Sequence, residues 1–255
     1  MNKVPEVTLF FWVIKILATT VGETAADNLN TSFNLGLTST SIIMAVLLAA
    51  VLVIQFRARR YVPPVYWLAV VLISVVGTLV TDNLVDNFGV TLKETTAVFA
   101  VALAATFAVW YRSERTLSIH SIFTTKREAF YWTAILFTFA LGTAAGDLVA
   151  ETFNVGYWQS ALLFAGCIAA VVVAWRVFKM GPILSFWIAY ILTRPLGASL
   201  GDYLSQDKTD GGLGLGTVAT SIIFLTAILL VVVYLTRTKI DQLPPAVDEP
   251  QRVAA

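Results

Sequence analysis

The sequence predicts an all-α membrane protein: a bundle of eight transmembrane helices, built from four tandem two-helix repeats, with both termini in the cytoplasm. Hydrophobic residues make up 58% of the 255-residue chain and charged residues only 13%, which is more apolar surface than a soluble domain can bury. The apolar segments each approach the ~20 residues that a helix needs to cross ~30 Å of hydrocarbon. In addition, one motif occurs four times with the same internal spacing, as expected of tandem duplication.

The repeated motif is W-x9-G-x4-D, preceded by a second aromatic residue. The tryptophans stand at positions 12, 67, 132 and 187, so successive copies begin 55, 65 and 55 residues apart. We therefore expect one transmembrane domain over residues 1–240. Its repeats are predicted at residues 8–60, 63–115, 128–180 and 183–238. The aromatic pairs are Phe11-Trp12, Tyr66-Trp67, Tyr131-Trp132 and Phe186-Trp187.

Each repeat contributes two apolar spans joined by a short polar link, which we interpret as a helical hairpin. The first span is not a cleavable signal, because it carries charged residues and matches the later copies position by position. Odd-numbered spans carry the motif, whereas even-numbered spans are nearly free of charge and are expected to face lipid or to support the others. The spans are predicted at residues 8–29, 37–56, 65–86, 94–111, 129–151, 157–176, 183–204 and 213–235.

Orientation follows from the basic residues, which are enriched in cytoplasmic loops. Lys and Arg follow every even-numbered span, for example Arg57 and Arg112, and few follow the odd-numbered spans. All four copies should therefore insert the same way up, with the tryptophans at the cytoplasmic interface. The tail over residues 241–255, which contains three prolines, is expected to be unstructured and cytoplasmic.

Acidic residues lie within spans that should otherwise exclude charge. Each motif aspartate stands fifteen residues after its Trp, about 22 Å along a helix, and so in the outer third of the bilayer. Three further acids lie one helical turn away on the same face. We expect all of them to converge, and they form the candidate cation-binding or proton-relay site: Asp27, Asp82, Asp147 and Asp202 as metal ligands, with Glu23, Asp86 and Glu151.

Basic partners for these acids are scarce. An ionised side chain at mid-membrane costs ~2.5–3.5 kcal/mol, so protons, water or a bound cation are expected to offset the charge. Lys15 is predicted to extend to the inner interface. Arg194 lies eight residues before Asp202 and is interpreted either as a counter-ion or gate of the site or as a structural residue.

Small residues recur around the motif and predict close approach of the odd-numbered helices. The motif glycines are Gly22, Gly77, Gly142 and Gly197. Asn28 and Asn83, each next to a motif aspartate, are expected to support the site with neutral oxygens. Threonines on the same turns could contribute too, although such hydroxyls often bond only to their own helix.

Residue chemistry excludes several classes of site. Cys167 and His120 are the only residues of their types, so neither a thiolate zinc site nor a bis-histidine haem can form within one chain. A net charge of +1 gives no basic face for nucleic acid. We expect no cofactor and no enzymatic activity. Carboxylate, amide and hydroxyl oxygens suit hard cations.

The leading hypothesis is a transporter for a hard cation, such as Mn²⁺ or Mg²⁺, with or without coupling to protons, and the lipid bilayer and the ion as its partners. An alternative is a sensor or partner-binding subunit that transports nothing, in which the acids hold the bundle together by sharing protons. A third is a Mg²⁺-dependent membrane enzyme acting on lipid phosphates. Such an enzyme would need basic groups at the depth of the acids to bind the phosphate.

Three phrases resemble a known family: TTVGETAADNL, LGTAAGDLVAETF and, above all, TRPLGASLGDYL followed by GGLGLG. They are similar to bacterial polytopic proteins described as uncharacterised membrane-anchored proteins, and the likeness covers residues 3–240. The resemblance implies a multi-pass protein of the bacterial inner membrane and carries no activity.

Overall fold

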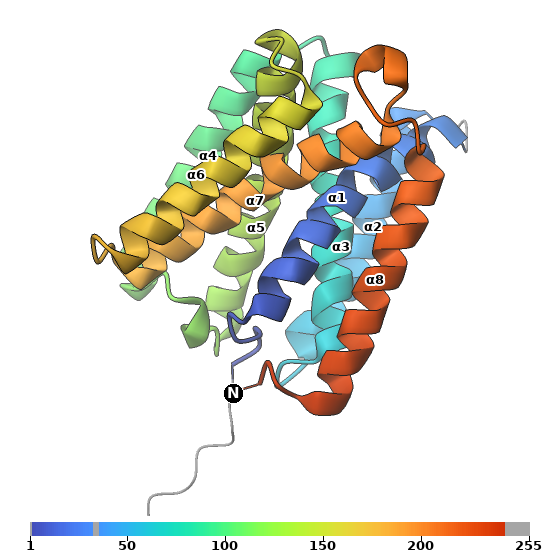
Figure 1. The fold of residues 1–255 in the computed structure, drawn as a ribbon. Coiled ribbons are helices and arrows are strands. Elements are labelled where there is room, and N and C mark those ends of the chain that lie inside the picture. The colour runs from blue at the N-terminus through green and yellow to red at the C-terminus, as the bar shows by residue number, and fades with distance from the viewer. Residues whose placement is uncertain (1, 33–35, 243–255) are drawn as a thin grey trace, which may run out of the picture.

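The computed structural model describes residues 2–32 and 36–242, and these residues form eight α-helices (Figure 1). Each helix is long and apolar enough to cross a membrane, so the prediction of eight apolar helices and the all-α class is confirmed. Most of the predicted tail, residues 243–255, lies outside the described part. The helices are α1 Leu9–Ser32, α2 Leu37–Arg57, α3 Pro63–Asp82, α4 Leu92–Glu114, α5 Thr125–Asp147, α6 Tyr157–Arg176, α7 Pro182–Ser205 and α8 Thr217–Thr238.

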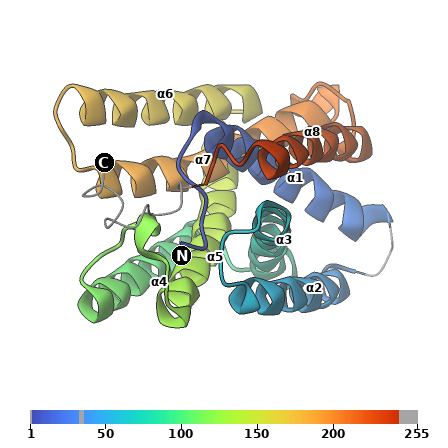
Figure 2. The ribbon, with the colours of Figure 1, turned by 90° about the horizontal axis from the view of Figure 1, so that it is seen from below.

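The four odd-numbered helices form a closed inner ring. Helix α1 packs against α3 and α7, and α5 packs against the same two helices. In the most apolar stretch of each odd-numbered helix at least 56% of the residues are buried, against at most 28% in the even-numbered helices. The even-numbered helices are therefore the outer set, as predicted (Figure 2). We call the end of the ring where the odd-numbered helices begin the aromatic end, and the opposite end the acidic end.

The outer helices do not pack on their own repeats. Helix α2 packs against α3, α4 against α5, α6 against α7, and α8 closes the circle against α1, whereas α1 and α2 make few contacts. The prediction of helical hairpins is therefore wrong. Chain connectivity places the two helices of a repeat near each other, but the interlocking of side chains decides which helix surfaces pack, and here it favours the next repeat.

The motif glycines bring neighbouring ring helices together, and every contact follows the same cyclic rule. A Cβ atom on the glycine of one repeat would come within 3.0 Å of the residue three positions before the glycine of the next repeat. Close approach of the ring helices thus requires glycine at each position, as predicted. The contacts are Gly22 with Ser74, Gly77 with Phe139, Gly142 with Arg194, and Gly197 with Thr19.

Two ring helices widen at the acidic end. Helix α3 continues as a π-helical segment, Asn83–Asn87, and α5 continues as Leu148–Thr152. π-Helical turns are rare in proteins, and those that do occur are frequently found at functional sites. They carry Asp86 and Glu151. Short 3₁₀ turns at Ile119–Ser121 and Lys208–Asp210 complete the described elements.

Segments before α1 and after α8 cover the aromatic end. Lys3 forms a buried ion pair with Glu128, with 2.7 Å between Nζ and Oε2. Tyr61 donates a hydrogen bond to Asp241 Oδ2 at 2.6 Å, and burial raises the pKa of Asp241. Asp241 is 1% exposed, so the prediction that the unstructured tail begins there is wrong.

Candidate functional site

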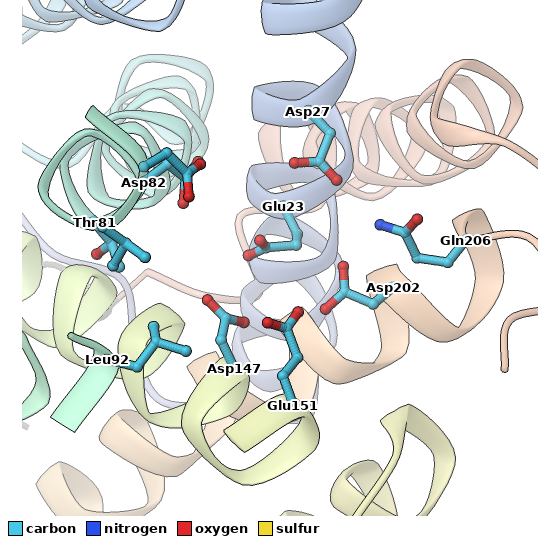
Figure 3. Close-up of a pocket in the computed structure, with 11 residues that line it drawn as sticks. Glu23, Asp27, Thr81, Asp82, Leu92, Asp147, Glu151, Asp202 and Gln206 are labelled. Carbon is cyan, nitrogen blue, oxygen red and sulfur yellow. The ribbon is translucent and has the colours of Figure 1, made fainter. Parts of the chain in front are cut away.

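The seven predicted acidic side chains surround one cavity at the acidic end of the ring (Figure 3). The cavity measures about 190 Å³, which is room for several waters or a partly hydrated cation. Asp86 and Glu151 are exposed, whereas Glu23 and Asp202 are buried. The cavity is lined by Glu23, Asp27, Thr81, Asp82, Val85, Asp86, Leu92, Asp147, Glu151, Asp202 and Gln206.

Three carboxylates in this cavity lie close enough to share a cation. Glu23, Asp147 and Asp202 each offer an oxygen, and these atoms all lie within 4.8 Å of one another. Oxygen ligands bound at ~2.1–2.5 Å lie at most ~4–5 Å apart across a metal ion. The tightest group thus comes from α1, α5 and α7 and differs from the predicted set of motif aspartates. Asp27 and Asp82 line the cavity beside it.

Asp202 is a buried carboxylate of this cavity that needs a partner. It is 7% exposed and faces the cavity (Figure 3). Among the described residues no hydrogen bond or ion pair reaches its side-chain oxygens. Because an ionised carboxylate is costly to bury alone, a proton, water or a cation must meet it in the cavity.

Arg194 forms an ion pair with one acid of the cavity, Glu23. Its Nη2 lies 2.8 Å from Glu23 Oε2, and both side chains are almost fully buried. Its Nη1 donates to the carbonyl oxygen of Thr19 at 2.7 Å. Arg194 is thus a counter-ion of Glu23, which is one of the roles that the sequence left open for it, and the expected scarcity of basic partners does not hold for this acid. Arg194 is eight residues from the acid of its own helix, but the ring brings Glu23 of α1 beside it.

The guanidinium also bonds to two hydroxyls from the remaining ring helices. Arg194 Nη2 donates to Thr143 Oγ1 at 2.6 Å and to Thr78 Oγ1. Glu23, Thr78 and Thr143 occupy the same place in their repeats, one position after the motif glycine. One side chain from the fourth repeat thus contacts the equivalent residue of each other repeat, which places it at the centre of the ring.

Lys15 lies deeper, toward the aromatic end. Its Nζ sits over the rings of Phe139 and Tyr190 at 4.0 and 4.2 Å from their centroids, and it has no hydrogen-bond partner among the described residues. The side chain is fully buried. The prediction that Lys15 extends to the interface is wrong, because two aromatic faces stabilise the ammonium group inside the ring.

The aromatic pairs pack inside the ring as well. Trp67, Trp132 and Trp187 are at most 4% exposed, and Tyr66 and Tyr131 share a hydrogen bond of 2.5 Å between their hydroxyls. The prediction that the tryptophans anchor the protein at the membrane interface is wrong for these three. Instead, aromatic side chains of neighbouring inner helices contact one another inside the bundle.

Asn28 and Asn83 do not line the cavity. Asn28 Nδ2 donates to Thr217 of α8 at 3.5 Å, and Asn83 Nδ2 donates to Ser41 of α2 at 2.6 Å. The prediction that they support the site is therefore wrong, since these amides join the ring to the outer helices.

Gln206 lines the cavity and was missed. It lies four residues after Asp202, the spacing that led us to Asp86 and Glu151. The four-residue spacing from a motif aspartate could therefore have identified Gln206 as well.

Comparison with protein families identifies the same four repeats. The matching family is described as a repeat of unknown function, DUF347, and its matches cover residues 10–61, 65–116, 130–180 and 185–241. Comparisons with curated proteins and with solved structures found no significant match. The four matched segments cover most of the chain, and each contains one W-x9-G-x4-D motif. The chain therefore belongs to the DUF347 repeat family.

Proposed function

We propose that this protein is a membrane transporter for a hard cation, a divalent metal such as Mn²⁺ or Mg²⁺, and that the acidic cavity is its binding site. One observation carries the proposal: oxygens of Glu23, Asp147 and Asp202, from three different repeats, lie within 4.8 Å of one another. Hard divalent cations prefer oxygen ligands. Acids buried in membrane helices commonly mark ion paths or proton relays.

Charge balance within the cavity supports a cation as the ligand. Seven carboxylates line this space, and Glu23 among them forms an ion pair with Arg194. Like charges so close repel strongly in a poorly solvated site, and a cavity lined by one sign of charge concentrates the opposite ion. A divalent cation would relieve this repulsion, and its departure would favour uptake of protons. Exchange of the metal for protons is therefore part of the proposal.

The membrane setting of the proposal rests on the basic residues at the helix ends. We place the protein in the bacterial inner membrane with both termini in the cytoplasm. The acidic end then faces the extracytoplasmic side, and the aromatic end faces the cytoplasm. Ions would enter the cavity from outside or leave it to the outside along the axis of the ring.

Binding of Mn²⁺ to the purified protein tests the first half of the proposal. We expect saturable thermal stabilisation, because a ligand that binds only the folded state at ~100 times its Kd adds ~2.7 kcal/mol. Asp147→Asn should weaken the apparent affinity at least about tenfold. Asp210→Asn, the same change at an exposed acid outside the cavity, should leave it unchanged.

Uptake of Mn²⁺ into proteoliposomes tests the second half. We expect flux through the unmodified protein and little flux through Asp147→Asn at equal reconstitution. Saturable binding without flux in either direction would favour a sensor or partner-binding subunit. No metal-dependent stabilisation in the unmodified protein would contradict the proposal, as would equal binding by Asp147→Asn.

A further inference from the structure

Glu23 belongs to two groups at once. Its carboxylate is one of the three that could share a cation with Asp147 and Asp202. The same carboxylate accepts a hydrogen bond from Arg194 Nη2 at 2.8 Å. A cation bound by the three acids would interact with the same Glu23 carboxylate that now forms an ion pair with Arg194. The bound ion and the guanidinium are therefore competitors for one side chain.

Arg194 stands where the axis of the ring must open if anything is to pass. It is fully buried and bonds to residues of α1, α3 and α5 from its own position on α7. The cavity lies on one side of this layer and the packed aromatic residues lie on the other. The layer of Arg194 therefore separates the cavity from the packed aromatic residues along the axis.

A second buried basic residue lies close to Arg194. Arg194 Cζ lies 5.7 Å and Lys15 Nζ 4.0 Å from the centroid of the Phe139 ring. When both groups are protonated, they repel each other in a poorly solvated interior. Arg194 Nε is also buried without a partner among the described residues. Glu23 is thus the only anionic group bonded to Arg194 in the described structure.

We infer that Arg194 is a tethered cation that closes the axis and that exchange of Glu23 from Arg194 to a bound metal ion opens it. The inference rests on the proposed function and adds the residue that couples binding to opening. When the metal binds Glu23, the guanidinium loses its counter-charge and is repelled by the metal. When the metal leaves, Glu23 returns and the axis closes.

A double-mutant cycle on Mn²⁺ affinity tests the competition. Arg194→Gln should tighten binding at least about fivefold, the lower range of coupling between sites, because Glu23 becomes free for the metal. Glu23→Gln should weaken binding. Glu23→Gln/Arg194→Gln should bind no more than about twofold tighter than Glu23→Gln, since the competitor now has nothing to release.

The cycle separates the competition from a general charge effect. If removing Arg194 tightens binding equally with and without Glu23, only the long-range field of the guanidinium is at work and the inference is overturned. Unchanged or weaker binding by folded Arg194→Gln also overturns it, although Mn²⁺ binding by the unmodified protein would leave the proposed function intact. If the unmodified protein binds no Mn²⁺, the proposed function fails first.

Thiol accessibility tests the opening with both charges in place, so it does not depend on the folding of Arg194→Gln. Thr143 is fully buried and its hydroxyl accepts a hydrogen bond from Arg194 Nη2. In a Cys167→Ala background, a cysteine replaces it as Thr143→Cys. Mn²⁺ should raise its rate of modification by a membrane-impermeant thiol reagent at least about fivefold. The added change Glu23→Gln should abolish this increase, and a rate that Mn²⁺ does not alter overturns the inference.

Discussion

The two ends of the inner ring handle buried charge in opposite ways. At the aromatic end Glu128 is paired with Lys3, also accepts a hydrogen bond from Gln55 Nε2 at 3.1 Å, and is 1% exposed. At the acidic end Asp202 is buried beside other carboxylates without an ion pair among the described residues. The comparison teaches that the protein itself satisfies the buried carboxylate Glu128, whereas Asp202 needs a proton, water or a cation from outside.

The aromatic end should respond most strongly to the loss of one charge. Lys3→Met leaves Glu128 buried and unpaired, which typically costs 3–5 kcal/mol. We expect a loss of about that size in the free energy of unfolding, measured by SDS titration in mixed micelles. Added Mn²⁺ should not restore it specifically, because Lys3 pairs with Glu128 and neither residue lines the acidic cavity.

The matched control is Lys3→Met/Glu128→Gln, which removes both charges and should recover much of the loss. A stability of Lys3→Met equal to that of the unmodified protein would show that water reaches Glu128. The two ends would then not differ in the way described.

The next largest loss in the free energy of unfolding is expected at the motif glycines, where the helices of the inner ring approach each other closely. A Cβ atom at Gly77 would lie 2.7 Å from Phe139 Cβ and 3.2 Å from the backbone nitrogen of Ala140. Overpacking of this kind costs typically 1–3 kcal/mol, so Gly77→Ala should lower the free energy of unfolding by about that amount. Gly166→Ala on α6 meets nothing within 4 Å and should be neutral or slightly stabilising.

Similar losses for the two alanine variants would show that the ring does not depend on close approach at the motif. The convergence of the acids would then need another cause. Circular dichroism before the titration checks that both variants are equally helical.

The acidic end should show the smallest change in stability and the opposite sign. Asp202→Asn removes a buried carboxylate that lacks a partner, so we expect metal-free protein to gain roughly 1 kcal/mol. The same variant should lose Mn²⁺ affinity. Stability that falls on this change would indicate that the protein already satisfies Asp202, and the acidic end would then resemble the aromatic end.

Much of the fold could be predicted from the sequence because each part of it depends on local pattern. Length and apolarity fix the helices, and the fixed distance from Trp to Gly to Asp places Asp27, Asp82, Asp147 and Asp202 at the same level of equivalent helices. One helical turn relates Glu23 to Asp27. Their gathering around one cavity follows from the repeat and is what the structure shows.

The pairing of charged groups was not predictable in this way. Arg194 lies eight residues before Asp202 on α7, which is too far for the two side chains to pair. Nothing in the sequence of α1 or α7 alone indicates that Glu23 would contact Arg194. The amides of Asn28 and Asn83 point to outer helices whose order around the ring no local pattern determines. Lys15 likewise depends on Phe139 and Tyr190, which come from other helices.

By itself the sequence determined eight apolar helices, their fourfold repetition, and the level at which acids and glycines stand along them. Only the tertiary structure decided that each outer helix packs on the next repeat and that one arginine occupies the centre of the ring. The physical reason is that periodicity and helical rise act within one helix, whereas contacts between helices depend on how whole surfaces interlock.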